Sequence, residues 1–379
     1  MQERYLAASP HNLVRVILGE RHIDDNDVNN VYTRGAASFE QWIADGILKQ
    51  DDQPAFYVYF QDFKVPESGE SLTRKGFIGL GKVEDYSAGV VYRHEQTLSG
   101  PKKDRLQVLQ YSRAHFGQIF MLYADQDGRV DQELDAAAQG TPALDVTDEY
   151  GARHRVWMLQ DAERIKRIQS LMEPMKLLIA DGHHRYETSL NYRNEHPEDP
   201  AAHFTMMTFV NQNSRGLRIL ATHRVVSGLD KFSTYALLEK AKAPWQATPA
   251  DSLNRLKTEL AKSSASTIRI GVVTKDGFYL LTRPRGAGEL DVPVLHQEIL
   301  GNWLGIDEHA VRDEKNIQYV RGIEAAATHV SSGEAQAAFL LVATPIEEMA
   351  RVAYSGGVMP QKSTDFYPKL LTGVTIYKL

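Results

Sequence analysis

The most informative part of the sequence is residues 177–187, Leu177-Leu178-Ile179-Ala180-Asp181-Gly182-His183-His184-Arg185-Tyr186-Glu187. Its first four residues are apolar and predict a short buried strand. Gly182 predicts a tight turn, and the residues that follow, as far as Arg193, continue as a helix. The first N–H groups of a helix have no partners within the helix and carry partial positive charge. The stretch therefore predicts an anion-binding turn, and phosphate fits such a turn well.

The turn offers further groups for phosphate chemistry. Arg185 can place two N–H groups on two phosphate oxygens, and the backbone N–H groups of Gly182, His183 and His184 are expected to hold the same anion. Asp181 is a candidate catalytic base and a candidate ligand for a magnesium ion that accompanies the phosphates. His184 is a candidate catalytic residue that would add a hydrogen bond or positive charge. The alternative is that these side chains only form the start of a helix.

The composition excludes several classes of protein. The chain has 379 residues, a formal net charge of -6 and no cysteine, so disulfides, thiolate nucleophiles and cysteine-ligated metals are excluded. The acidic balance argues against broad nucleic-acid binding, which requires a basic face. No apolar run approaches the roughly 20 residues that span a bilayer, and the N-terminus has no signal-peptide pattern. We therefore expect a cytoplasmic protein without a membrane partner.

A second group of candidate residues precedes the central stretch. Glu95 is a candidate general base for a serine-like hydroxyl, and its neighbours His94 and Thr97 are candidate substrate-binding residues. Ser99 and Lys102 lie where the sequence predicts the start of a helix, and they are candidate phosphate-binding residues of a second anion turn. The alternative is a solvated helix start that carries ordinary charges.

Two later segments supply the remaining candidates. Lys362, Ser363 and Thr364 lie in a polar, turn-rich tail and are candidate phosphate-binding residues of a loop that covers the site. The same loop carries a second lysine, Lys369. His223 and Arg224 lie on an apolar strand and are candidate substrate-binding residues. For a histidine on such a strand the alternative is a structural role in the core.

Mixed strands and helices without strict alternation predict an α+β fold. We place a boundary at residue 226, between a core domain of residues 1–226 that carries the phosphate-binding turn and a C-terminal α/β domain of residues 227–379. The tail loop of the second domain is expected to return to the site. The β-branched run Leu13–Leu18 predicts a strand.

The order of motifs resembles the bacterial domain-of-unknown-function family 1015. The resemblance rests on blocks spread over nearly the whole chain: residues 11–15, 76–80, 94–102, 179–187, 222–224 and 359–373. Members of this family usually carry a further N-terminal segment with a Pro-Pro-Tyr-Asp-Val-like motif, and this chain begins after it. Either the start of this sequence is truncated or this version of the family lacks that segment.

The block Asp181–Glu187 also resembles the nucleotide-binding turn of the ParB/sulfiredoxin superfamily, in which free-serine kinases carry an Asp-Gly-His-x-Arg turn. This resemblance implies a ParB/sulfiredoxin-like core and phosphoryl transfer. In family 1015 it implies a pyrophosphate-dependent serine kinase. The superfamily also contains DNA-binding partition proteins, so the fold alone does not decide the activity.

We therefore expect a small-molecule kinase. It would transfer a phosphoryl group from pyrophosphate or a nucleotide to a free hydroxyl amino acid, with L-serine as the leading acceptor and Mg²⁺ as the cofactor. Its partners would be this acceptor and the phosphoryl donor, and the sequence leaves the oligomeric state open. Two alternatives remain: a non-catalytic nucleotide- or DNA-responsive binding protein, and a metal-dependent phosphatase or other hydrolase that uses Asp181, His183, His184 and His94.

Overall fold

The computed structural model describes residues 2–95, 99–262 and 265–379. The chain divides into two compact units, each with its own sheet and its own core. Unit 1 contains Met1–Arg93, Thr97–Leu217 and Pro368–Leu379, and unit 2 contains His94–Gln96 and Arg218–Tyr367. Several sheets occur together with helices in both units, so the expected α+β class is confirmed.

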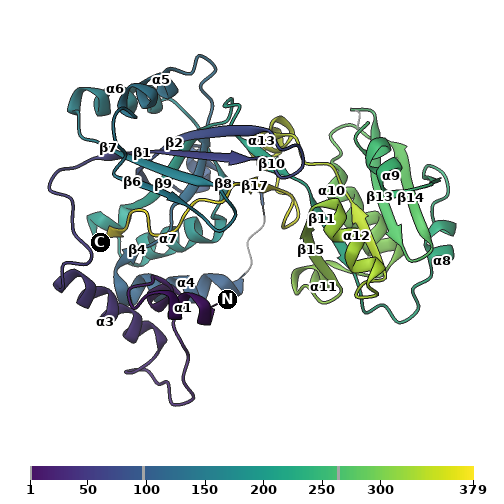
Figure 1. Cartoon of the computed structure of the whole chain (residues 1–379), viewed down its shortest axis with the longest axis horizontal. Coiled ribbons are helices and arrows are strands. Elements are labelled where there is room, and N and C mark those ends of the chain that lie inside the picture. Colours follow the sequence, from purple (N-terminus) through teal and green to yellow (C-terminus); the bar gives the residue numbers. More distant parts are fainter. Residues whose placement is uncertain (1, 96–98, 263–264) are drawn as a thin grey trace. The chain divides into compact units, whose positions relative to one another are not determined.

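Unit 1 is built on an eight-stranded sheet with the order β3-β8-β5-β9-β2-β1-β7-β6 (Figure 1). The bounds of these strands are β1 Phe56–Lys64, β2 Ser71–Lys82, β3 Val91–Tyr92, β5 Ile119–Tyr123, β6 Leu144–Thr147, β7 Arg153–Leu159, β8 Leu177–Asp181 and β9 Phe204–Asn211. The pairs β3–β8 and β5–β9 are parallel, and the other neighbours are antiparallel. Two short strands, β4 (Ala114–His115) and β18 (Tyr377–Lys378), form a separate pair.

Seven α-helices belong to the described part of unit 1. Their bounds are α1 Gln2–Ala8, α2 Val14–Ile17, α3 Val31–Ala44, α4 Ser99–Ser112, α5 Arg129–Ala137, α6 Ala162–Met172 and α7 His183–Glu195. Short 3₁₀ turns occupy Tyr86–Ala88 and Pro200–His203. In Figure 1, α5 and α6 lie on one side of the sheet, whereas α1, α3 and α4 lie on the other.

The two faces of this sheet differ, because successive side chains of a strand point to opposite faces. One face is apolar and packs against α5 and α6; it includes Val58, Phe60 and Phe77. The opposite face includes Tyr59 and Ile78, and the C-terminal tail, Pro368–Leu379, packs on it. The tail therefore returns to the sheet of unit 1 after the chain has built unit 2.

Unit 2 contains a six-stranded antiparallel sheet with the order β12-β14-β13-β16-β11-β15. The strands are β11 Thr222–Val226, β12 Gln246–Ala250, β13 Thr267–Thr274, β14 Gly277–Pro284, β15 Ile317–Arg321 and β16 Ala337–Leu340, and β10 (Arg218–Leu220) pairs with β17 (Asp365–Tyr367). The helices are α8 Thr234–Glu239, α9 Leu253–Leu260, α10 Asp291–Val294, α11 Glu308–Arg312, α12 Ile323–Ser331 and α13 Ile346–Tyr354, with a π-helical segment at Leu295–Trp303. One apolar cluster contains α9 and α12, and another contains α8, α10 and the π-helical segment.

Two local predictions differ from the structure. The predicted strand at Leu13–Leu18 is wrong, because Val14–Ile17 forms one helical turn that buries Val14 and Val16. The predicted boundary at residue 226 lies later than the division in the structure, which falls between Leu217 and Arg218. The reason is that β11 pairs with β15 and β16, so it belongs to the sheet of unit 2. Strand pairing of this kind is a long-range property that a local pattern does not reveal.

Candidate functional site

The predicted strand, turn and helix are present at the central stretch. Strand β8 ends at Asp181, Gly182 adopts a backbone conformation with φ of 98°, and α7 begins at His183. A positive φ of this size favours glycine, because a Cβ would be strained there. Gly182 has no side chain that could cap the helix, so the N-terminal end of α7 keeps its partial positive charge facing the turn.

A change of register directs Asp181 to one face of the sheet. Met121 of β5 pairs with Ile179, but Phe120 pairs with Asp181, so β8 advances two residues while β5 advances one. Such a bulge changes the face to which the following side chain points. Ile179 belongs to the apolar face, whereas Asp181 pairs with Lys369 of the tail. The bulge thus places Asp181 on the tail side of the sheet.

Asp181 lies between two cations. Its Oδ2 accepts a hydrogen bond from Nζ of Lys369 at 3.1 Å, and its Oδ1 lies 3.8 Å from Nη2 of Arg185. Burial tends to raise the pKa of Asp181, but the charges of Lys369 and Arg185 outweigh burial and hold this pKa well below its usual range. Asp181 is therefore a carboxylate at neutral pH.

Arg185 lies directly over the turn. A Cβ built on Gly182 would come within 2.8 Å of both Nε and Nη2 of Arg185, so the guanidinium occupies the space that a side chain at position 182 would need. Nε of Arg185 is buried and has no hydrogen-bond partner among the residues that the structure describes, while 38% of the side chain remains exposed. Loss of hydration lowers the pKa of Arg185; Asp181 opposes this shift, and the nearby Arg105 adds to it.

Arg74 is a third cation of this region, and it is not among the residues that the sequence predicted for the site. It is 1% exposed, and its guanidinium lies 4.6 Å from the ring centroid of Phe120. Nε donates to Oε1 of Gln61 at 2.9 Å, and Nη2 donates to the carbonyl of Pro368. Burial lowers the pKa of Arg74 to about 10, against the raising effects of Tyr59 and Asp181, so Arg74 stays charged at neutral pH.

Positive charge exceeds negative charge around the turn. Arg74, Arg185 and Lys369 all act electrostatically on Asp181, which supplies one negative charge against three positive charges. Together with the N-terminus of α7, this excess of positive charge attracts an anion. We name this set of four side chains with Gly182 the cation cluster. It can hold a phosphoryl group, because guanidinium, ammonium and helix N–H groups are the usual donors to phosphate oxygens.

The two histidines of the turn lie at the start of α7. His183 is buried, at 7% exposure. His184 is half-buried, and its carbonyl accepts a hydrogen bond from the hydroxyl of Thr188 at 2.8 Å. All five predicted residues from Asp181 to Arg185 are thus in one turn of unit 1.

The structure brings a different group of predicted residues together in unit 2. The fully buried His94 shares a hydrogen bond of 2.8 Å between its Nε2 and the hydroxyl of Thr364. Glu95 forms a β-bridge with Met359. The hydroxyl of Ser363 donates to the carbonyl of Pro360 at 2.6 Å. These contacts hold the segment before β17 against residues 94 and 95.

Arg224 is the buried cation of this second group. Its Nη2 donates to the carbonyl of Lys362 at 3.0 Å, and its Nε donates to Nε2 of His296 at 3.2 Å. Burial lowers the pKa of Arg224 to about 10, against the raising effects of Tyr319 and Glu95. Lys362 thus contributes its backbone carbonyl to this group.

His223 points away from Arg224, as neighbours on a strand do. Its Nδ1 accepts a hydrogen bond from the backbone N–H of Leu341 at 3.3 Å, and burial lowers its pKa to about 4. This environment is that of a neutral structural histidine. The prediction that it faces a substrate together with Arg224 therefore does not fit the strand geometry.

Three of the predicted residues lie wholly or partly outside the described structure. Thr97 lies outside the described residues. Ser99 and Lys102 lie in the first turns of α4, as predicted for the start of a helix, and their side chains are outside the described part of the structure.

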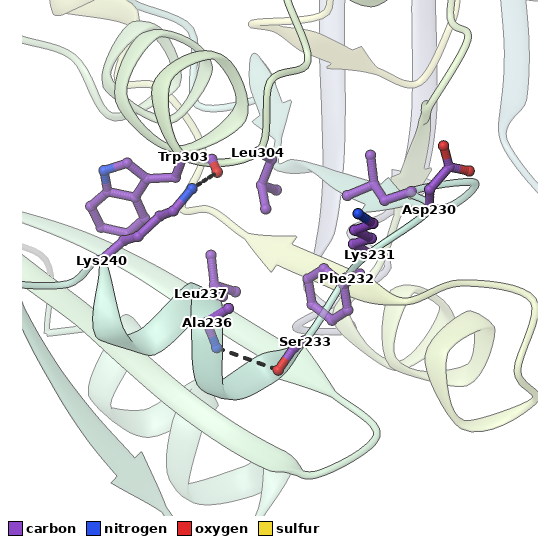
Figure 2. A pocket seen from close by; sticks show the side chains of 10 residues that line it. Asp230, Lys231, Phe232, Ser233, Ala236, Leu237, Lys240, Trp303 and Leu304 are labelled. Carbon is purple, nitrogen blue, oxygen red and sulfur yellow. Dashed lines mark hydrogen bonds between the residues drawn. The ribbon is translucent and has the colours of Figure 1, made fainter.

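A cavity of about 220 Å³ lies in unit 2, apart from the predicted residues (Figure 2). Phe232, Leu237 and Leu304 are among its apolar lining residues. Figure 2 shows Lys240 beside Trp303, and its Nζ donates to the carbonyl of that residue. None of the residues predicted for phosphate chemistry lines this cavity.

Comparison with known proteins identifies a family. A family model described as a protein of unknown function, DUF1015, matches residues 1–299. No curated protein matches the chain. Within the described residues, none of the helices has the length and apolar character needed to cross a membrane.

Several solved structures resemble the chain at low identity. One is a mutant free serine kinase in complex with AMP, with 12% identity and a TM-score of 0.42, over 76% of this chain and 87% of that chain. A conserved hypothetical protein from Pyrococcus furiosus has 14% identity and a TM-score of 0.41, over 78% of this chain and 93% of that chain. SbnI with a C-terminal truncation, from Staphylococcus aureus, has 13% identity and a TM-score of 0.39, over 78% and 85%. TM-scores this low carry no conclusion about function.

Proposed function

The chain belongs to the DUF1015 family of proteins of unknown function, and we propose that this member is a small-molecule phosphotransferase whose phosphate site is the cation cluster of unit 1. One observation carries the proposal: Arg185 and Lys369 both lie within 4 Å of a single carboxylate at the N-terminus of a helix, and the buried Arg74 acts electrostatically on the same carboxylate. This arrangement has an excess of positive charge where backbone N–H groups also converge, and both features favour a phosphoryl group.

Each residue of the turn has a proposed task. Arg185 binds two oxygens of the phosphoryl group, and the N–H groups at the start of α7 bind others. Asp181 is ionised and orients the acceptor hydroxyl by accepting its hydrogen bond. In phosphoryl transfer, positioning and charge stabilisation provide most of the catalysis, so a weakly basic carboxylate is adequate for this task. His184, half-buried beside this turn, is the proposed further hydrogen-bond donor.

The proposed acceptor is free L-serine, and the proposed donor is pyrophosphate or a nucleotide. The support for these substrates is the resemblance of Asp181–Glu187 to the Asp-Gly-His-x-Arg turn of free-serine kinases. In the reaction the bridging P–O bond to the terminal phosphorus of the donor breaks, and a new P–O bond forms between that phosphorus and the serine hydroxyl oxygen. Phosphate leaves from pyrophosphate, or the shortened nucleotide leaves from a nucleotide donor, and the hydroxyl proton passes to this leaving group or to water.

Magnesium is proposed to enter with the donor. Mg²⁺ is usually bound by one or two carboxylates together with phosphate oxygens, and the ionised Asp181 is a suitable carboxylate. Among the described residues, the group of three side chains close enough to share one ion is His22, Asp24 and Asp25, which is not part of the turn. Asp181 and the donor oxygens would therefore hold the ion, which would neutralise phosphate charge.

The two alternative functions have weaker support. A hydrolase with His94, His183, His184 and Asp181 as metal ligands would need these side chains to form one cluster. They are absent from the ligand groups found among the described residues. A nucleic-acid-binding function is disfavoured by the net charge of -6.

The test of the proposed function is the formation of phosphoserine. Purified protein is incubated with L-serine and Mg²⁺, together with pyrophosphate, ADP or ATP in separate reactions, and the product is followed by ³¹P NMR. We expect phosphoserine with at least one donor, and we expect Asp181→Asn to lower the rate by about 100-fold, because it removes the charge that orients the hydroxyl. Absence of phosphoserine with all three donors would show that the protein is not a serine kinase that uses these donors.

A further inference from the structure

The C-terminal tail is anchored on unit 1 by buried polar side chains. The carbonyl of Pro368 accepts a hydrogen bond from Arg74, and the carbonyl of Lys369 accepts one from Nε2 of Gln61 at 2.9 Å. Two residues further on, the N–H of Leu371 donates to the hydroxyl of Tyr59 at 3.1 Å. Arg74, Gln61 and Tyr59 are at most 2% exposed.

These hydrogen bonds constrain the position of the tail, because a buried polar group that loses its partner lowers the free energy of unfolding. Gln61 and Arg74 lie opposite each other on β1 and β2, and Oε1 of Gln61 accepts from Nε of Arg74 at 2.9 Å. The tail carbonyls accept hydrogen bonds from Nη2 of Arg74 and from Nε2 of Gln61, whereas Nη1 of Arg74 is buried without a hydrogen-bond partner among the described residues. The backbone of the tail at Lys369 is therefore held in place by the sheet, in the way that a residue of a binding site is held.

The side chain of Lys369 is half exposed, in contrast with the buried side chains that hold its backbone. Its exposed fraction is 54%, and that of Asp181 is 41%. An exposed ion pair of this kind contributes little to stability, typically up to about 1 kcal/mol. Lysine is a compact point charge on a flexible stem, so its ammonium can exchange one anionic partner for another without movement of the backbone.

We propose that Lys369 is a second phosphate-binding residue of the cation cluster, and that its ammonium passes from Asp181 to the phosphoryl oxygens when the anion binds. Before the anion binds, the Asp181 carboxylate is thus the partner of Lys369, and the exchange leaves this carboxylate available to orient the acceptor. A bound phosphoryl group carries more negative charge than one carboxylate and draws both Lys369 and Arg185. The inference rests on the proposed phosphate-binding role of the turn.

The binding of inorganic pyrophosphate alone, measured by isothermal titration calorimetry without serine, tests this inference. We expect Lys369→Met to weaken pyrophosphate binding by about 10-fold or more, because one charge-assisted hydrogen bond is lost. Lys369→Arg should restore much of the affinity. Lys378→Met is the matched control, since Lys378 is another tail lysine in an exposed ion pair, with Glu40, at 2.8 Å; its affinity should be unchanged.

A second substitution separates a phosphate ligand from a simple counterion of Asp181. Asp181→Asn removes the competing carboxylate, so it should tighten pyrophosphate binding, and Lys369→Met should still weaken binding in that background. If Lys369→Met is folded and binds pyrophosphate as tightly as the unaltered protein in both backgrounds, the inference is wrong. If binding depends on Lys369 but no phosphoserine forms, the inference stands and the serine kinase proposal fails. If phosphoserine forms while binding is independent of Lys369, the inference alone fails.

Discussion

Replacement of Arg185 with methionine is expected to weaken the binding of inorganic pyrophosphate by about 100-fold or more. Arg185 is the donor that offers two parallel N–H groups to the anion, and each hydrogen bond to a charged group contributes roughly 1.5–3 kcal/mol. The fold should survive, because the ion pair with Asp181 spans 3.8 Å and both side chains are more than a third exposed. Such pairs contribute about 0–1 kcal/mol. Calorimetry and a thermal melt of the same samples give both quantities.

Arg164 provides the matched control for this substitution. It occupies the third position of α6, after the N-cap Asp161, just as Arg185 occupies the third position of α7, after Gly182. It also pairs with a carboxylate, Glu133, at 3.2 Å. Arg164→Met should leave pyrophosphate binding unchanged. Equal affinities of the Arg185→Met and Arg164→Met proteins would show that Arg185 does not bind phosphate.

The second large effect is expected at Gly182, where alanine should disturb both stability and binding. A backbone φ of 98° is strained for alanine, which costs roughly 1–2 kcal/mol in the free energy of unfolding. The new Cβ would also lie 2.8 Å from Nε and Nη2 of Arg185. The flexible guanidinium would move away, so pyrophosphate binding should weaken by nearly as much as in Arg185→Met, about 100-fold.

A control substitution at Gly128 separates the effect of backbone strain from the effect of displacing Arg185. It precedes α5 as the N-cap residue with φ of 64°, and nothing lies within 4 Å of a Cβ built there. Gly128→Ala should therefore lower the midpoint of urea unfolding without changing the affinity for pyrophosphate. If Gly182→Ala behaves like Gly128→Ala in the binding assay, the position of Arg185 over the turn has no functional role.

The local part of the candidate site could be predicted from the sequence. An apolar run, a glycine and a polar helix start within eleven residues are properties of neighbouring positions, and the structure has β8, Gly182 and α7 at those positions. The mixture of elements likewise predicted the α+β class. The short helix at Val14–Ile17 was missed because a β-branched run is equally consistent with one buried helical turn.

The remainder of the site depends on contacts that are distant in the sequence. In the sequence nothing distinguishes Arg74 from the other arginines of the chain. Its partners Gln61 and Pro368 result only from the pairing of β1 with β2 and from the path of the tail. The tail was expected to cover the site with two lysines, Lys362 and Lys369. Lys369 is the one that contacts Asp181, whereas the carbonyl of Lys362 accepts a hydrogen bond from Arg224. The bulge opposite Phe120, which turns Asp181 toward that lysine, has no signal in the sequence.

The contacts of the predicted residues in unit 2 could not be predicted from the sequence either. His94, Arg224 and Thr364 were proposed for the same site as Asp181, but their described contacts lie within unit 2. Polar residues near strand ends are recognisable in a sequence, but the sheet that each strand joins is not. The burial of His223 against the N–H of Leu341 is an example, because the alternation of side chains along β11 separates it from Arg224.

A crystal structure of the protein with inorganic pyrophosphate would show whether the turn between β8 and α7 binds a phosphoryl group. We expect the anion within hydrogen-bonding distance of the Arg185 guanidinium and of the backbone N–H groups at the start of α7, with Lys369 turned from Asp181 toward the anion. Pyrophosphate bound at another place, with Arg185 and Lys369 still next to Asp181, would show that the turn is not a phosphate site.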